Sequence, residues 1–203
     1  MGNKELRRAV FLDRDGTINV EKSYLHRAAE FEFIPGAPEA IRLLREAGFL
    51  VIVVTNQSGV ARGYYDEEAV HRLHRFVDGE LAKAGTAIDA YYLCPHHPRH
   101  GVGPYRVECA CRKPLPGMIL AAAAAHGIDL RRSWLVGDKV IDVEAGTAAG
   151  CRSVIVRTGY GSDEAPLVPR QVPVCDDLIA AARLILAEEG SGIAAPVPGG
   201  DTV

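Results

Sequence analysis

Two aspartates one residue apart, Asp13 and Asp15, directly follow a short apolar run at positions 9–12. An apolar run of this kind is typical of a buried parallel strand. A second apolar run, at 134–137, ends in Asp138 in the same way. If both runs lie in one parallel sheet, their carboxyl ends meet at the edge where such sheets bind ligands. Clustered carboxylates repel one another unless a hard cation lies among them, so the pattern favours Mg²⁺ and a phosphate substrate.

The first two aspartates could divide the work of phosphate-ester hydrolysis between them. One carboxylate could attack phosphorus and form an acyl phosphate, and the other could protonate the leaving oxygen and then activate water. Gly16 allows the chain to turn at once, which would let both side chains face one pocket. The alternative is an Asp-rich turn that only caps a helix, and the second carboxylate after 134–137 makes this alternative the weaker one.

Three other segments carry groups that could bind phosphate. The hydroxyl of Thr55 and the backbone amides of residues 56–59 could cradle phosphate oxygens, although the same residues also suit an ordinary turn. Lys113 supplies a point charge, and Arg112 supplies a fork that could grip a phosphate through two hydrogen bonds. Lys139 could orient the carboxylates, or it could form a surface ion pair.

A second signal is a set of metal-ligating side chains in the stretch 94–111. Three thiols and one imidazole stand in two close pairs: Cys94, His96, Cys109 and Cys111. This set matches a tetrahedral Zn²⁺ site with no open position, so the zinc would be structural. The stretch has few apolar side chains, and a metal would supply the order that packing cannot. His97 and His100 are rival ligands, but His96 is expected because it mirrors the Cys-Xaa-Cys pair.

Expected strands and helices alternate along the chain, which predicts an α/β fold. We expect a doubly wound, mainly parallel sheet with helices on both faces. Strands are expected at 9–12, 49–54, 88–93, 134–137 and 153–156, and helices at 38–47, 66–84, 116–126, 143–149 and 177–188. Nothing between the motifs is long enough for a large cap domain, so we expect a minimal cap and a zinc-binding loop insertion. His71, His74 and His126 are expected on helix surfaces.

We expect one domain over residues 1–189 and a flexible tail over 190–203, which is rich in Gly, Pro and small residues. The net charge of −3 gives no basic footprint for nucleic acid. No apolar stretch reaches the ~18 residues of a membrane span, and the first residues lack a signal-peptide core. A cytoplasmic monomer is therefore expected. Five cysteines without a secretory signal argue against disulfides, and Cys151 and Cys175 are expected to be small apolar residues.

These motifs together resemble the haloacid dehalogenase-like phosphatase superfamily over nearly the whole chain. The resemblance implies that Asp13 is the nucleophile and Asp15 the general acid and base. It implies Mg²⁺ ligation by Asp13, by the backbone carbonyl of Asp15 and by Asp138. It also implies that Thr55 and Lys113 bind the phosphoryl group that is transferred.

Within the superfamily, the combination of motifs is similar to a branch that hydrolyses sugar bisphosphates and histidinol phosphate. The residues expected to bind substrate are Arg14, Glu21, Lys22, Ser23, Tyr24, Asn56, Gln57, Ser58, Arg112 and Lys139. The spacing in the zinc loop favours a phosphorylated sugar over histidinol phosphate. A polynucleotide 3′-phosphatase is disfavoured by the negative net charge and the lack of stacking platforms. A non-catalytic zinc-stabilised scaffold would not need the complete set of acidic and cationic residues.

Overall fold

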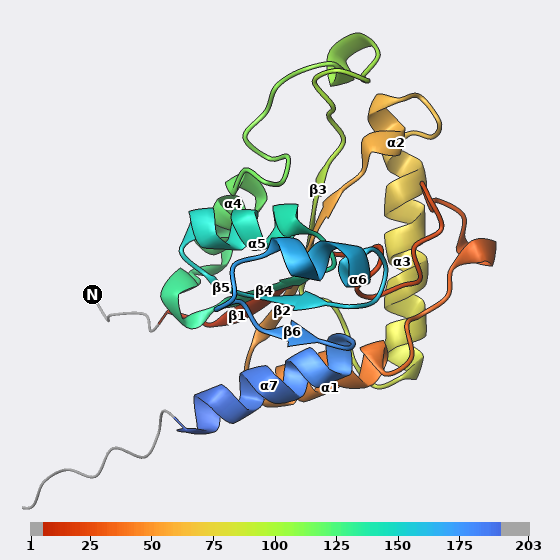
Figure 1. Cartoon of the computed structure of the whole chain (residues 1–203). Helices are drawn as coiled ribbons and strands as arrows, with labels where there is room; N and C mark the ends of the chain where they lie inside the picture. The colour runs from red at the N-terminus through yellow and green to blue at the C-terminus, as the bar shows by residue number, and fades with distance from the viewer. Residues whose placement is uncertain (1–5, 192–203) are drawn as a thin grey trace, which may run out of the picture.

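The computed structural model describes residues 6–191, which form a six-stranded parallel sheet with helices on both faces (Figure 1). The strands are β1 (Ala9–Leu12), β2 (Leu50–Asn56), β3 (Ala90–Cys94), β4 (Trp134–Gly137), β5 (Arg152–Val156) and β6 (Val174–Cys175). They lie in the order β3-β2-β1-β4-β5-β6, and every neighbouring pair is parallel. The predicted doubly wound α/β fold is therefore confirmed.

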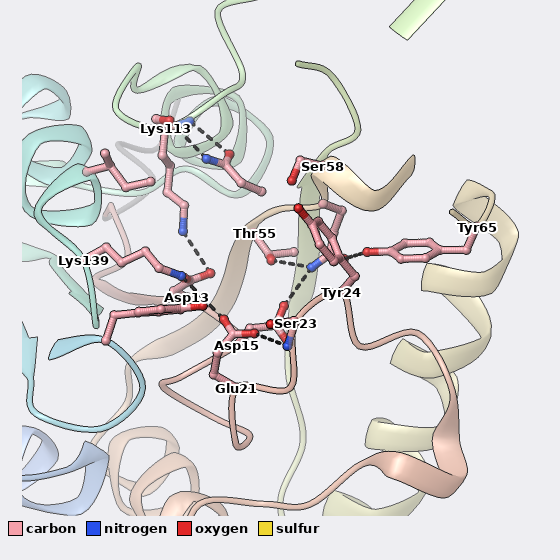
Figure 2. Close-up of a pocket in the computed structure, with 14 residues that line it drawn as sticks. Asp13, Asp15, Glu21, Ser23, Tyr24, Thr55, Ser58, Tyr65, Lys113 and Lys139 are labelled. Carbon is pink, nitrogen blue, oxygen red and sulfur yellow. Dashed lines mark hydrogen bonds and ion pairs between the residues drawn. The ribbon is translucent and has the colours of Figure 1, made fainter. Parts of the chain in front are cut away.

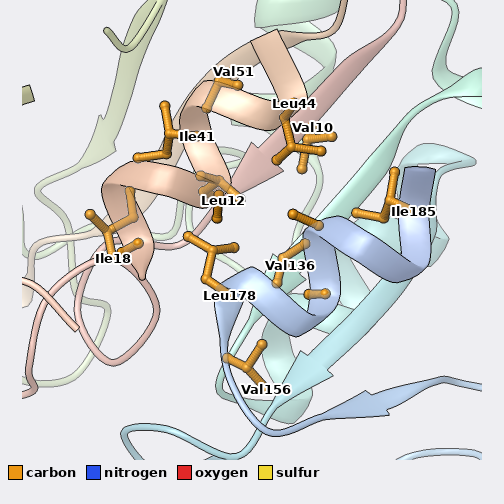
Figure 3. Close-up of a cluster of buried hydrophobic side chains, with 14 of the residues drawn as sticks. Val10, Leu12, Ile18, Ile41, Leu44, Val51, Val136, Val156, Leu178 and Ile185 are labelled. Atoms are coloured by element: carbon orange, nitrogen blue, oxygen red, sulfur yellow. The ribbon is translucent and has the colours of Figure 1, made fainter. Parts of the chain in front are cut away.

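The longer helices cover both faces of this sheet. They are α1 (Ala37–Glu46), α3 (Glu67–Lys83), α4 (Gly117–His126), α5 (Val140–Ala149) and α7 (Leu178–Ser191). Val10 and Leu12 of β1 pack in the core with α1 and α7 (Figure 3), and α3 contributes to the same core. Ala9 and Phe11 pack with α4 and α5. Successive side chains of a strand point to opposite faces, so a strand with both faces covered is apolar throughout.

Each predicted strand and helix is present, with ends that shift by up to three residues. The sequence did not predict the short elements: α2 (Ser58–Ala61), α6 (Gly161–Glu164), β6 and the 3₁₀ turns η1 (Ala28–Glu30), η2 (Gly103–Tyr105), η3 (Leu130–Arg132) and η4 (Ala165–Leu167). Such segments are too short to carry a periodic apolar signal. The predicted tail began at residue 190, but α7 continues through Ser191, and residues 192–203 lie outside the described residues.

Helix α3 begins as expected, since the side chain of Asp66 accepts a hydrogen bond from the Ala69 amide at 2.7 Å. The placement of His74 on the surface was wrong, because only 4% of this residue is exposed. His74 follows Val70 by four residues and precedes Val77 by three, which puts it on the buried stripe of the helix. His71 is exposed and His126 half-buried.

The chain between β3 and α4 forms the predicted irregular insertion, which projects beyond the carboxyl end of β3 (Figure 1). It packs on α2 and α3, where the Val102 amide donates to the Ala61 carbonyl at 2.8 Å. The Tyr105 hydroxyl donates to the Glu67 carboxylate at 2.9 Å. Among residues 6–191, no helix is long and apolar enough to cross a membrane.

Candidate active site

A pocket of about 270 Å³ contains most of the side chains singled out from the sequence (Figure 2). Its lining is Asp13, Asp15, Glu21, Ser23, Tyr24, Thr55, Asn56, Gln57, Ser58, Tyr65, Lys113, Lys139, Ile141 and Tyr160. Asp13 directly follows β1, and Thr55 and Asn56 end β2, which is its neighbour in the sheet. The pocket therefore lies at the carboxyl ends of the strands, at β1, which has β2 on one side and β4 on the other.

Lys113 lies at the centre of the charged groups. Its ammonium is 2.9 Å from Asp13 Oδ1 and 2.6 Å from Asp142 Oδ1, and it donates to the Val54 carbonyl at 2.8 Å. Burial alone would lower the pKa of Lys113, but Asp13 and Asp142 together raise it. The lysine therefore stays charged, and it neutralises part of the carboxylate cluster.

Asp13, Asp138 and Asp142 each offer an oxygen within 4.8 Å of the others. Asp138 is fully buried, and the Tyr160 amide donates to its Oδ2 at 2.9 Å. Its Oδ1 has no hydrogen-bond partner in the part of the chain that the structure describes, and the nearest cation is Lys139 Nζ at 3.8 Å. Burial and the charge of Asp13 raise the pKa of Asp138 to about 7. An unpartnered buried oxygen beside two further carboxylates fits a hard divalent cation such as Mg²⁺.

Two glycines allow the backbone to close around Asp138. A Cβ at Gly16 would lie 2.2 Å from Asp138 Oδ2, and a Cβ at Gly159 would lie 2.3 Å from the same atom. Both glycines also have positive φ angles, of +83° and +58°. Any side chain at either position would therefore displace the Asp138 carboxylate from the cluster.

The carboxylate of Asp15 accepts hydrogen bonds from three side chains. The buried Arg14 donates from Nη2 to both of its oxygens, at 2.9 and 2.8 Å, and Asn19 and Gln57 each donate at 3.0 Å. Burial alone would raise the pKa of Asp15, but the charge of Arg14 and the three donors hold it below its usual value. The two aspartates thus have different surroundings, as two separate roles require.

The prediction that Arg14 binds substrate does not fit its position. Its side chain is 1% exposed and does not line the pocket, because the guanidinium is directed to Asp15 and to the Leu25 carbonyl at 3.0 Å. Lys22 is also outside the pocket lining, since its ammonium bonds to the Glu30 carbonyl and pairs with Glu32. Arg112 does not line the pocket either, and its guanidinium donates to the His96 carbonyl at 3.2 Å.

The turn after β2 is fixed by its own polar side chains. The Gln57 amide donates to Thr55 Oγ1 at 2.9 Å as well as to Asp15, and the Tyr65 hydroxyl donates to Gln57 Oε1 at 2.9 Å. Asn56 both accepts from the Lys113 amide and donates to the Lys113 carbonyl, at 3.1 and 3.0 Å. This turn therefore connects β2 to the segment that carries the buried lysine.

The opposite wall of the pocket comes from the segment after β1. Ser23 and Tyr24 both have positive φ angles, of 49° and 61°, and Glu21 accepts from the Ser23 amide at 2.7 Å. Lys139 lies 3.6 Å from Glu21 and 4.4 Å from the ring centre of Tyr160. Consecutive non-glycine residues in the left-handed region are costly, so this wall is held in shape by the contacts around it.

Sequence reasoning missed several residues of the site. Tyr65, Ile141 and Tyr160 line the pocket, but none of them belongs to a motif that a sequence pattern could identify. Asp142 was not among the predicted site residues, and it makes a direct ion pair with Lys113. Its position three residues after Lys139 is typical of a residue that caps α5, but it does not indicate the contact with Lys113.

The predicted zinc ligands form a second cluster, outside the pocket. Cys94, His96, Cys109 and Cys111 each offer a ligand atom within 4.8 Å of the others. Cys109 Sγ lies 3.5 Å from Cys94 Sγ and 3.2 Å from Cys111 Sγ, and no disulfide joins any cysteine of residues 6–191. The rings of His97 and His100 lie beside each other instead, with 4.7 Å between their centres. Three thiols and one imidazole at this spacing suit a tetrahedral zinc ion.

Comparisons with known proteins agree with this fold. A family model described as haloacid dehalogenase-like hydrolase matches residues 10–93, and a second, described as HAD-hydrolase-like, matches residues 110–181. The D-glycero-beta-D-manno-heptose-1,7-bisphosphate 7-phosphatases of Yersinia pestis and Escherichia coli K12 are each 48% identical over 152 residues. These matches cover 74% of this chain and 81% and 80% of the two relatives. The chain belongs to the haloacid dehalogenase-like hydrolase family.

A solved structure of this hydrolase family extends the comparison. The D,D-heptose 1,7-bisphosphate phosphatase of B. bronchiseptica, crystallised with magnesium and phosphate, superposes with a TM-score of 0.80 at 37% identity. The match covers 89% of this chain and 99% of that one. In the described part of this chain, the carboxylates of Asp13, Asp138 and Asp142 lie close enough together to hold a metal ion.

Proposed function

We propose that the protein is a Mg²⁺-dependent phosphatase that removes the 7-phosphate of D-glycero-D-manno-heptose 1,7-bisphosphate in heptose precursor biosynthesis. One observation carries the chemistry: Asp13 lines the pocket beside the buried Lys113, with the unpartnered Asp138 Oδ1 in the same cluster. The substrate is supported by the relatives that bear this name and match about four-fifths of their own length.

In the proposed reaction, an oxygen of Asp13 attacks phosphorus, and the bond from phosphorus to the sugar oxygen breaks. Asp15 is ionised before substrate binds, so it takes up a proton when the negatively charged phosphate group binds beside it. It gives this proton to the sugar oxygen as that oxygen leaves, and then takes a proton from the water that hydrolyses the aspartyl phosphate. Lys113 and the hydroxyl of Thr55 bind the oxygens of the phosphoryl group. The cation would be held by Asp13, the Asp15 carbonyl and Asp138, and it would neutralise charge on those oxygens.

We also propose that a structural zinc ion holds the loop 94–111 and thereby orients Arg112 and Lys113. The loop is connected to this pair directly, because Cys111 precedes Arg112 and the Arg112 guanidinium donates to the His96 carbonyl. Arg112 lies outside the pocket lining but directly precedes Lys113, which lines it, so Arg112 would bind the phosphate that does not react, outside the pocket itself. Glu21, Ser23 and Tyr24 would line the sugar. The five free cysteines suit a reducing compartment, which supports a cytoplasmic enzyme, and we propose that it acts as a monomer.

Replacement of Arg112 tests the binding of the second phosphate. Arg112→Ala removes a charged, forked donor, so KM for the bisphosphate should rise about tenfold, whereas KM for the sugar monophosphate should hardly change. Steady-state phosphate release on both substrates gives the two values. Equal increases in KM for both substrates would mean that Arg112 does not bind the second phosphate.

The decisive experiment measures phosphate release by the purified protein in Mg²⁺, with the heptose bisphosphate and histidinol phosphate compared. Asp13→Asn serves as the blank. A large kcat/KM preference for the heptose that the variant abolishes would support both substrate and nucleophile. A preference for histidinol phosphate would retain the mechanism and replace the substrate. Activity on neither compound would remove the substrate assignment.

A further inference from the structure

His74 is a buried histidine of α3 that takes no part in the proposed reaction. Its ring stacks on Tyr91 of β3, with 4.2 Å between ring centres. Its Nε2 lies 3.4 Å from Nη1 of Arg14. Valine or leucine on the buried stripe of a helix would pack without desolvating a polar group, whereas the buried imidazole needs a hydrogen-bond partner.

The contact between His74 and Arg14 fixes the protonation state of the histidine. A guanidinium only donates hydrogen bonds, so Nε2 of His74 must accept. The imidazole is then neutral with its proton on Nδ1, a buried atom that has no hydrogen-bond partner among the described residues. Burial, together with the positive charge of Arg14, lowers the pKa of His74 to about 3, which agrees with a neutral ring. His74 thus acts as a fixed acceptor for the guanidinium.

Arg14 uses its other donors on two parts of the site. Nη2 donates to both oxygens of Asp15 and to the Leu25 carbonyl at 3.0 Å, and Nε donates to Asp15 at 3.3 Å. Leu25 directly follows Ser23 and Tyr24, the pocket residues with positive φ angles. A guanidinium is planar, so an acceptor on Nη1 also determines where Nε and Nη2 point.

We propose that His74 and Arg14 are positioning residues for Asp15: His74 accepts from Nη1 of Arg14 and thereby aims the rest of the guanidinium at the Asp15 carboxylate from beneath the pocket. This inference rests on the proposed function, in which Asp15 is the acid and base. It explains why Arg14 is fully buried and outside the pocket lining, and why α3 carries a histidine on its buried stripe.

Substrates with different leaving groups distinguish a misplaced Asp15 from a general loss of stability. The alkoxide of a sugar phosphate needs the proton of Asp15, whereas p-nitrophenolate leaves without one. Because kcat/KM covers the steps up to departure of the leaving group, a misplaced Asp15 should lower kcat/KM for the sugar bisphosphate and spare that for p-nitrophenyl phosphate. Loss of stability alone would lower both values in proportion.

The test variant is His74→Phe, which keeps a ring against Tyr91 and removes the acceptor. We expect kcat/KM for the heptose bisphosphate to fall about tenfold, a part of what general acid catalysis supplies, and kcat/KM for p-nitrophenyl phosphate to fall less than about twofold. His74→Gln retains an acceptor and should recover most of the loss. Val77→Ala, a core change one turn further along α3, should lower neither value selectively.

Three outcomes decide the matter. If Asp15→Asn retains heptose bisphosphatase activity, then the proposed role of Asp15 is wrong, and the inference falls with it. If Asp15→Asn is inactive and His74→Phe loses activity equally on both substrates, or on neither, then the inference is overturned and the proposed function stands. Should His74→Phe not fold, Arg14→Lys, which keeps the charge without the fork, is compared on the same substrates, and an equal loss on both again overturns the inference.

Discussion

At the scale of single residues, Lys113 determines whether the carboxylates of the site can be close together. It is 2% exposed and forms ion pairs with Asp13 and Asp142, both of them buried. Removal of one partner from a buried ion pair leaves an uncompensated charge, and this costs far more than the pair itself contributes. The lysine therefore has a structural role as well as the proposed role in phosphate binding.

The first prediction concerns this residue. Lys113→Met should lower the free energy of unfolding by about 3–5 kcal/mol and abolish phosphate release, because Asp13 and Asp142 lose their cation. Urea denaturation without added metal measures the first effect. Lys139→Met is the matched control: this lysine is partly exposed and lies farther from its partners, at 3.6 and 3.8 Å. Equal losses of unfolding free energy in the two variants would contradict the prediction.

The residues that could be located from sequence are those that follow strands. Asp13, Thr55 and Asp138 lie at or just after the ends of β1, β2 and β4, so sheet geometry alone brings them to one edge. Arg14 could not be placed, because nothing in the sequence tells which way a side chain points once the chain leaves a strand. The burial of His74 could have been predicted from its spacing to Val70 and Val77, but no sequence pattern indicates its contact with Arg14.

At the scale of elements, the insertion 94–111 contrasts with the sheet from which it projects. Its secondary structure in the described chain is one short 3₁₀ turn, and Val102 and Val107 are exposed. Cys94 ends β3, so one predicted ligand belongs to the sheet, while Cys109 and Cys111 lie at the far end of the insertion. A metal at this cluster would close the insertion at its base.

The second prediction follows from this arrangement. Removal of zinc with a strong chelator, or Cys109→Ser, should make residues 97–108 sensitive to limited proteolysis while the sheet stays folded, because metal ligation replaces apolar packing there. Mass spectrometry of the fragments and of bound metal gives both quantities. Cys151→Ser, which alters a buried thiol outside the cluster, should change neither. An intact insertion in zinc-free protein would show that packing on α2 is sufficient.

The long elements were predictable because their apolar patterns are long. The start of α5 was placed three residues late, at residue 143, whereas the helix begins at Val140. In the structure, Asp142 lies inside the first turn, where its Oδ2 accepts from the Lys139 amide at 3.1 Å. The same side chain thus caps the helix through one oxygen and pairs with Lys113 through the other, and this double use could not be inferred from spacing.

At the scale of the whole molecule, the site lies where two halves of the sheet meet at β1. Strands β2 and β3 extend to one side, and β4, β5 and β6 to the other, so loops from both halves converge on Asp13. Two separate apolar cores, one on each face, hold these halves together. The apolar stripe of α3 belongs to one of these cores, so the protonation of His74 is coupled to global unfolding and not only to the site.

The last prediction uses that coupling. The pKa of His74 is about 3 in the folded protein, against about 6.5 in the unfolded chain. The unfolded state therefore binds the proton more readily, and stability that is complete above about pH 6.5 is lost as the pH falls toward 3. Between about pH 7 and pH 5, this one group should lower the free energy of unfolding by about 1–2 kcal/mol.

Urea denaturation of the wild type and of His74→Phe at both pH values isolates this contribution. The carboxylates that do not contact Arg14 titrate alike in the two proteins and cancel in the difference, and Asp15, whose pKa is held below its usual value, is ionised at both pH values. The phenylalanine variant is expected to be less stable at neutral pH, since Arg14 loses an acceptor, and to lose less stability on acidification. If both proteins lose the same stability between the two pH values, then His74 takes up its proton in the folded state, and Arg14 cannot be donating to it.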